Sequence, residues 1–460
     1  MEGRINIKLI LKIIVYVGGV LISIYLVLIA SGYKFDSRQK RFVQTGAIHL
    51  SSNIKDDLKI YINGKLRSKK LPLKVKYLLP GSYSVVIEKD GYRKWQKNLE
   101  VKPGYVSDET DIILFFQEFT EQELNNTEGI LGFTLSDSRN EIMFWTDSKV
   151  YYQKIENGEP EEVYKLTNEK IIDVNANEGL DDFIIQAQDV GGRDLFYYCN
   201  SRPCQKAFDL NRGLKLNFEY VKLTFNDKYP ILASAEDNLY LLSSSYENHY
   251  IDSNVIDFGF FDDHTIYSRS SEKKIEIVKK DIDGTETEVI FSEEVKGKMA
   301  NEAYSIFIDK EEDKLYLINK SGNLLEYNKG KKEFISLNLN ATGLIFDNTN
   351  YLLIQNNNEL WVQGRVFPTD KKESVHLVAR YSSNIFDPGW LQKSNYILFI
   401  REGKLRAVHI KGSNETELYQ YKGIVNNKYS SISYTQIIIL DQGKIKNIKI
   451  TERGSLIDLW

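Results

Sequence analysis

The sequence predicts an all-β protein that follows a single N-terminal apolar helix. Tyrosine and phenylalanine are abundant, with 29 and 22 residues, whereas proline and methionine number only 8 and 3. Aromatic and β-branched residues suit half-buried strands. Past residue 130 no helical periodicity persists, and short apolar runs alternate with polar turns. With 460 residues the chain is long enough for two or more domains.

The predicted helix covers residues 13–30, which contain no charged side chain. At 1.5 Å per residue this stretch extends about 27 Å, close to the thickness of a bilayer core. It is interpreted as a transmembrane signal anchor, with residues 1–12 as a cytoplasmic tail. A cleaved signal peptide is the alternative, because Ala30, Ser31 and Gly32 are small residues at a suitable spacing.

The orientation of this helix is not decided by its flanking charges. Basic residues flank both ends almost equally, so the positive-inside rule alone is nearly balanced. Long domains after such a helix are commonly translocated. The prediction is therefore a single-pass protein of the cell membrane with most of the chain extracytoplasmic.

The two cysteines lie close together in the sequence. Cys199 and Cys204 stand five positions apart around an Arg-Pro turn, a separation that a disulfide can close. A disulfide would suit an oxidising exterior. Free thiols remain an alternative, and a zinc site is a further one that would need two more ligands nearby.

Residues 46–115 read as a small module of short strands, each closed by a turn former. Asn63-Gly64 suits a tight hairpin turn. The stretch after the Pro80-Gly81 corner has the period-2 alternation of a strand with one buried face.

The order of these motifs resembles that of the PEGA domain, a small β-sandwich-like surface module of bacterial and archaeal envelope proteins. The resemblance covers about 70 residues, and the sequence departs from it at 53–58, where "NIKDDL" replaces the tetrapeptide that names the family. Tyr92 and Trp95 are expected in the hairpin core, with glycan stacking as the alternative. The motif positions, all expected to be structural, are Tyr61, Ile62, Asn63, Gly64, Pro80, Gly81, Tyr83, Gly91, Tyr92 and Trp95.

Charge is distributed unevenly along the chain. Residues 54–105 carry a net charge of +8, and residues 106–460 carry −17. The basic module is a candidate for attraction to anionic lipid or wall polymer, although a merely solubilising face is the alternative. The acidic remainder argues against nucleic-acid binding.

From residue 131 to 460 the chain repeats a couplet of two apolar strands joined by a polar turn. Eight copies occur, with second strands 36 to 49 residues apart. This spacing is typical of four-stranded propeller blades, in which each couplet would form the middle hairpin. The prediction is a seven- or eight-bladed β-propeller with a loose, architectural resemblance to TolB- or YVTN-like propellers. Residues 31–45 and 116–130 are predicted linkers.

No motif in the sequence points to catalysis, a cofactor or a metal. Asp262, Asp263 and His264 are adjacent, but neighbouring strand residues face opposite ways, so a blade turn is favoured. "DIDGTETE" at 281–288 lacks the frame of a calcium loop.

These observations predict a non-catalytic envelope protein that uses its module as a spacer or wall contact and its propeller as a platform for an unknown envelope protein or glycan. A polysaccharide-active hydrolase or lyase, which would require paired carboxylates in the propeller channel, is one alternative. A purely structural spacer is the other.

Overall fold

The computed structural model describes residues 7–37, 39–224, 226–261, 263–271, 274–294, 304–309, 312–348, 350–364, 375–412, 415–423 and 427–454. The chain forms two compact units. The first comprises the chain up to Phe119 and again from Ile450, and the second is Thr120–Lys449.

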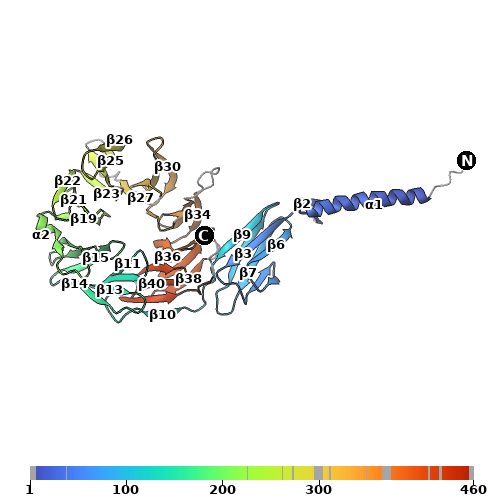
Figure 1. The fold of residues 1–460 in the computed structure, drawn as a ribbon, viewed down its shortest axis with the longest axis horizontal. Helices are drawn as coiled ribbons and strands as arrows, with labels where there is room; N and C mark the ends of the chain where they lie inside the picture. The colour runs from blue at the N-terminus through green and yellow to red at the C-terminus, as the bar shows by residue number, and fades with distance from the viewer. Residues whose placement is uncertain are drawn as a thin grey trace. The chain divides into compact units, whose positions relative to one another are not determined.

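The first unit begins with helix α1 (Ile7–Ala30). Its stretch Lys12–Ala30, with mean hydropathy 2.7, is long and apolar enough to cross a membrane. A hairpin of β1 (Tyr33–Asp36) and β2 (Arg41–Gln44) comes directly after it (Figure 1). Residues 31–45, predicted as a linker, thus contain a hairpin whose strands pair on either side of the Lys40 turn.

Two small sheets make up the module after this hairpin. Its core is closed by the side chains that alternate inward from both sheets, among them Ile48, Val85 and Trp95. The three-stranded sheet has the order β6 (Leu73–Leu78), β3 (Gly46–Ser52), β9 (Val106–Ile112), with β3 and β9 parallel. The four-stranded sheet has the order β5 (Lys65–Ser68), β4 (Lys59–Ile62), β7 (Gly81–Glu88), β8 (Trp95–Val101).

The end of the chain returns to this module. The amide of Phe116 donates to the carbonyl of Ile450 at 2.9 Å, and Thr451 is completely buried. Residues from 450 onward thus belong to the first unit, so the predicted propeller range of 131–460 is too long at its end.

The described part of the second unit contains eight four-stranded antiparallel sheets, which are numbered as blades 1 to 8. Blade 1 contains β11 (Gly132–Leu135), β12 (Glu141–Trp145), β13 (Lys149–Lys154) and β14 (Glu161–Lys165), and blade 2 contains β15 (Lys170–Ala176), β16 (Phe183–Gln188), β17 (Asp194–Cys199) and β18 (Phe208–Asp209). Blade 3 contains β19 (Phe218–Leu223), β20 (Ile231–Ala235), β21 (Asn238–Leu242) and β22 (Asn248–Asp252), and blade 4 contains β23 (Val255–Phe261), β24 (His264–Ser271), β25 (Lys274–Asp281) and β26 (Thr287–Glu294). A short helix α2 (Leu210–Leu214), capped by Asp209, separates blades 2 and 3.

Blades 5 to 8 have the same pattern until the last strand. Blade 5 contains β27 (Tyr304–Asp309), β28 (Lys314–Asn319), β29 (Asn323–Asn328) and β30 (Glu333–Asn340), and blade 6 contains β31 (Gly343–Ile345), β32 (Tyr351–Gln355), β33 (Glu359–Gly364) and β34 (His376–Arg380). Blade 7 contains β35 (Phe386–Trp390), β36 (Tyr396–Arg401), β37 (Lys404–His409) and β38 (Thr416–Gln420), and blade 8 contains β39 (Lys428–Ser433), β40 (Gln436–Asp441), β41 (Lys444–Lys449) and β10 (Thr120–Glu123).

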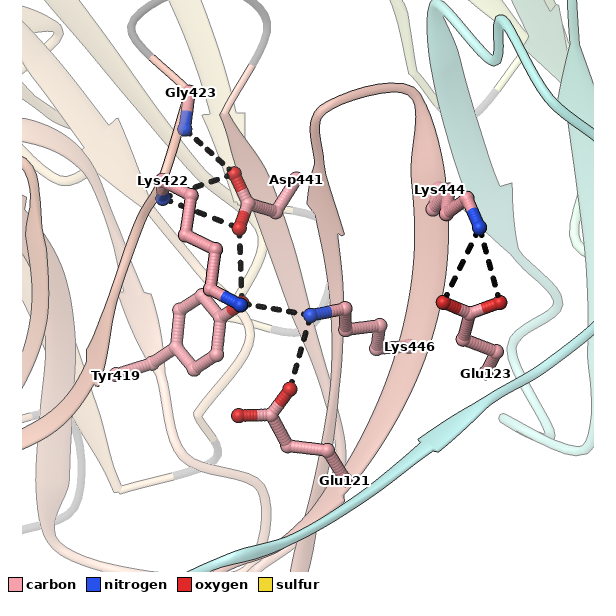
Figure 2. Close-up of polar contacts among 8 residues, drawn as sticks. All are labelled: Glu121, Glu123, Tyr419, Lys422, Gly423, Asp441, Lys444 and Lys446. Atoms are coloured by element: carbon pink, nitrogen blue, oxygen red, sulfur yellow. Dashed lines mark hydrogen bonds and ion pairs between the residues drawn. The ribbon is translucent and has the colours of Figure 1, made fainter.

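Blade 8 is completed by a strand from the other end of the unit. Strand β10 pairs with β41, so the start of the unit supplies the outermost strand of its last blade. Figure 2 shows the two ion pairs across this seam, Lys446 with Glu121 and Lys444 with Glu123. The predicted linker 116–130 therefore contains the strand that closes the ring.

Apolar clusters between neighbouring sheets make the ring continuous. One cluster joins Phe144 of blade 1 to Ile438 of blade 8, and further clusters join blades 1 to 7 in succession. Blades 7 and 8 meet where the Tyr429 hydroxyl bonds the carbonyl of Leu398. The result is an eight-bladed β-propeller, and each predicted couplet supplies the second and third strands of one blade (Figure 1).

Candidate functional site

A polar pocket of about 320 Å³ lies at the first strands of blades 8, 1 and 2. Neighbouring blades contact one another through these first strands, as β11 does with β15, so they line the propeller's centre. We call this cavity the inner-strand pocket. Its lining includes Phe133, Asp137, Arg139, Glu178, Lys428 and Tyr429.

Arg139 ties three blades together across the pocket. It occupies a left-handed position (φ 59°) in the turn between β11 and β12. One terminal nitrogen donates to Ser430 Oγ at 3.1 Å, and the other lies 3.9 Å from a carboxylate oxygen of Asp347 in blade 6. The side chain is 26 % exposed, so the guanidinium is fixed but still reached by solvent.

Lys428 supplies a second cation. Its ammonium lies 5.7 Å from the ring centres of both Phe133 and Trp145, close enough for cation–π attraction. Among the described residues no carboxylate oxygen lies within 4.0 Å of this ammonium nitrogen, the limit for an ion pair. Without forming a close ion pair, it acts electrostatically on Asp387 of blade 7.

Two carboxylates stand at the exposed edge of the same pocket. Asp137 and Glu178 are exposed, and the amide of Asp137 donates to the carbonyl of Glu178 at 3.0 Å, which holds the two turns together. In the described part of the chain neither carboxylate has an ion-pair partner. The pocket thus presents partly buried positive charge and exposed negative charge.

Two side chains on neighbouring first strands have a raised pKa. Burial raises the pKa of the Tyr429 hydroxyl well above its usual range. Burial also raises the pKa of Asp387, an effect that Lys428 partly offsets. Asp387 is nevertheless exposed to solvent, and water reduces this rise in its pKa.

A second pocket of about 530 Å³ has a different chemistry. It lies at turns of blades 5 and 6 and is lined largely by amide and hydroxyl side chains, with no carboxylate. Its principal polar groups are Asn319, Ser321, Asn340, Thr342, Asn356 and Asn357.

The structure places the predicted module motif in turns and core. Asn63 (φ 49°) and Gly64 (φ 74°) form the hairpin turn between β4, which ends with Tyr61 and Ile62, and β5. After the Pro80-Gly81 corner, Tyr83 donates its hydroxyl to the carbonyl of Leu79.

The aromatic end of that motif faces the protein interior. Trp95 is 5 % exposed, and the ring of Tyr92, which comes after the Gly91 turn, lies 5.0 Å from that of Phe116. Glycan stacking on Trp95 would require an exposed ring face, which this arrangement does not offer.

Cys199 and Cys204 are joined by a disulfide and buried in the core between blades 1 and 2. Both thiols are consumed, so this pair offers neither a free nucleophile nor a zinc ligand.

The acidic motifs of the sequence diverge in space. Asp262 lies outside the described residues. Asp263 accepts a hydrogen bond from Asn226 at 2.9 Å, whereas His264 Nε2 lies 2.7 Å from Asp281. The 281–288 segment contains the turn that joins the end of β25 to the start of β26, with the Gly284 amide bonded to the Asp281 carbonyl. Within the described ranges no three His, Cys, Asp or Glu side chains form a metal-binding group.

Sequence reasoning missed the inner-strand pocket. Its walls come from residues 133–139, 176–178 and 428–430, which meet only when the ring closes. No local motif could have indicated it.

Comparison with known proteins gives a family for the module and a fold for the propeller. Residues 45–108 match the PEGA domain family. A search of curated proteins finds no match. The C-terminal WD40 domain of Sif2 is similar in structure, with TM-score 0.50, 10 % identity, and coverage of 73 % of this chain and 99 % of that one.

Two other solved structures align with lower TM-scores. The WD40 domain of SCAP from fission yeast gives 0.44 at 9 % identity, covering 73 % of this chain and 99 % of that one. PorZ, a bacterial surface component of the type-IX secretion system of Porphyromonas gingivalis, gives a TM-score of 0.40 at 11 % identity. The alignment covers 72 % of this chain and 46 % of PorZ. The chain thus contains a PEGA domain at residues 45–108, and a β-propeller of WD40-like architecture lies after it.

Proposed function

We propose that this protein is a membrane-anchored, extracytoplasmic and non-catalytic binding protein. Helix α1 anchors it, the PEGA domain acts as a spacer or wall contact, and the propeller binds a polypeptide segment at the inner-strand pocket. The observation that carries this proposal is the arrangement of charges in that pocket, with the cations Arg139 and Lys428 within it and the carboxylates Asp137 and Glu178 at its edge.

The charge pattern favours a polypeptide over a glycan. A peptide segment offers separated positive and negative groups that can meet both halves of the pocket. Sugars are commonly held against exposed aromatic faces, but Phe133 and Tyr429 are only 1 % and 7 % exposed. The pocket of blades 5 and 6, lined mostly by amide and hydroxyl side chains together with Lys320, is where a glycan would bind instead.

The extracytoplasmic location rests on three supports. The helix Lys12–Ala30 has the length and composition of a membrane span. The PEGA family is a surface module, and the Cys199–Cys204 disulfide suits an oxidising compartment. Protease treatment of intact cells tests it: the propeller should be degraded while a cytoplasmic control protein survives.

Photo-crosslinking in the native membrane tests the binding site. A photoreactive residue at Glu178 should capture a protein, and Arg139→Ala should reduce this product at least tenfold. A photoreactive residue at Val190, which is 97 % exposed in a turn of blade 2, is the matched control. Equal capture from Val190, or capture that ignores Arg139, would overturn the polypeptide proposal. Capture of glycan alone would favour the sugar-binding alternative, and a ligand-free pocket would favour a spacer.

The non-catalytic part of the proposal has its own test. A hydrolase needs two carboxylates about 5 to 10 Å apart. Asp387 is a first-strand carboxylate whose pKa is raised by burial, so it is the group to test as a proton donor. We expect purified protein to leave a panel of envelope polysaccharides intact. Hydrolysis that disappears in Asp387→Asn would establish the enzyme instead.

A further inference from the structure

The hairpin directly after α1 has one aromatic face and one charged face. Strands β1 and β2 pair with Phe35 opposite Phe42, and the two rings meet edge to face at 5.4 Å. Because side chains alternate across a strand, Lys34 and Arg41 point to the other face. The hairpin therefore separates its aromatic and basic side chains.

The aromatic face continues onto the helix. The ring of Tyr25, on the last turns of α1, lies 6.3 Å from that of Phe42. Phe35, Phe42 and Tyr25 are 50 %, 39 % and 50 % exposed, so the three rings form an aromatic surface that the protein itself leaves uncovered.

The hairpin is fixed to both of its neighbours. Thr45 donates its amide and its hydroxyl to the carbonyl of Gly32, at 2.8 and 2.6 Å, which closes the hairpin onto the helix end. The Gly104 amide donates to the Thr45 carbonyl at 3.0 Å and ties this point to the PEGA domain. The aromatic surface therefore has a set place at the end of the apolar helix.

We propose that Tyr25, Phe35 and Phe42 form an interfacial collar that lies in the headgroup region of the phospholipid bilayer crossed by α1. This inference rests on the proposed anchoring. Aromatic rings gather at the two interfaces of membrane-spanning segments, where an apolar body meets a polar boundary. Tyr25 lies five residues before the helix end and Phe35 five residues after it, so the collar continues the apolar surface of the span and its position implies the bilayer as occupant.

The collar has a mechanical consequence for the anchor. A helix held only by apolar length can tilt or slide to match the bilayer thickness. Rings fixed by the bonds of Thr45 to Gly32 would set the depth of the helix end and the distance of the PEGA domain from the surface.

Spin labelling of the full chain in phosphatidylcholine vesicles tests the collar. Because Cys199 and Cys204 are bonded to each other, a single introduced cysteine can be labelled selectively. Nitroxides are placed at Phe35→Cys, at Leu21→Cys within the helix, and at Leu66→Cys on β5. Leu66 is the matched control, since its exposure of 50 % equals that of Phe35. Phe42→Cys is the second collar variant.

Collision rates with oxygen and with a water-soluble nickel chelate report the depth of each label. We expect the ratio of the oxygen rate to the nickel rate to be at least threefold higher at Phe35 and Phe42 than at Leu66. If the collar labels match Leu66 while Leu21 is in the acyl core, the collar is wrong and the anchoring stands. If Leu21 is also in water, the anchoring itself fails.

Lipid charge separates the collar from simple electrostatic attraction. Insertion of the rings should persist without anionic lipid and at high salt, because it depends on apolar contact. If the rings insert only when the anionic lipid phosphatidylglycerol is present, basic residues make the contact and the collar proposal is wrong.

Discussion

Lys446 on β41 donates to Glu121 on β10 at 2.9 Å, a contact between residues 325 positions apart. The same ammonium lies 3.1 Å from the Tyr419 hydroxyl, which in turn donates to the buried carboxylate of Asp441 at 2.9 Å (Figure 2). Burial opposes the charge of Lys446, but its bonds to Glu121 and Tyr419 raise its pKa overall. The ring is thus closed by a partly buried polar network as well as by strand pairing.

Lys446→Met should destabilise the propeller by about 1 to 2 kcal/mol, because it leaves partners of a charged hydrogen bond without their donor. Lys444→Met is the matched control on the same strand. Its partner Glu123 is 45 % exposed and Lys444 itself 40 %, so the loss should stay below about 0.5 kcal/mol. Urea unfolding of the two variants measures both values, and equal losses would argue against a role for the buried network.

Asn53→Ala should destabilise the first unit by about 2 to 3 kcal/mol. The buried Asn53 side chain donates to Thr451 Oγ1 at 2.8 Å and accepts from the Leu114 amide at 3.0 Å, so its removal leaves buried polar groups unpaired. Asn98→Ala on β8, where the side chain is exposed, should cost less than about 0.5 kcal/mol. Thermal unfolding of the two variants compares them, and a similar loss from both would show that the buried bonds contribute little.

The blade hairpins could be predicted from the sequence, whereas the β10–β41 pairing that closes the ring could not. Each hairpin has an apolar second strand that repeats every 36 to 49 residues, so eight copies are visible in the sequence. Strand β10 reads "TEQE", and all four of its residues are exposed. It pairs through its backbone and through the ion pairs of Glu121 and Glu123, which leaves no hydrophobic pattern to detect.

Long-range contacts limit the prediction of sites for a related reason. The turn of Asn63-Gly64 is encoded by the two residues that form it. Arg139 acquires its role only because Ser430 and Asp347, on distant blades, are brought to it by the ring. Local rules therefore recover the PEGA turns and the blades, whereas the inner-strand pocket requires the assembled propeller.

Gly91→Ala should destabilise the PEGA domain by about 1 to 2 kcal/mol. Gly91 has φ +80° with no atom near an added Cβ, so the cost is backbone strain alone. Gly91→Asn should lose less than half as much, because asparagine tolerates left-handed geometry. Limited proteolysis should show cleavage within the domain while the propeller remains intact. Loss of propeller binding with an intact PEGA domain would contradict this prediction.

Alkaline pH should unfold the protein through its buried tyrosines. Ten tyrosines among the described residues have a raised pKa, mainly because burial disfavours the phenolate, and the pKa values of Tyr152 and Tyr419 reach about 12. Above pH 10 the unfolded chain loses these protons at a lower pH than the folded chain does, and for Tyr152 and Tyr419 this window ends near pH 12. The free energy of unfolding therefore falls as pH rises, by about 1.4 kcal/mol per pH unit for each such tyrosine.

Phenolate absorbance and far-ultraviolet circular dichroism, recorded in one alkaline titration, measure this coupling. Because the buried hydroxyls can ionise only when they reach water, the part of the phenolate absorbance that belongs to these ten of the 29 tyrosines should appear together with the loss of β-structure. Tyr419→Phe removes one of the linked protons, so the slope of stability against pH should become shallower in this variant even though it loses the bond to Asp441. A rise in phenolate that is complete while the β-signal is intact would show that these tyrosines ionise within the folded ring.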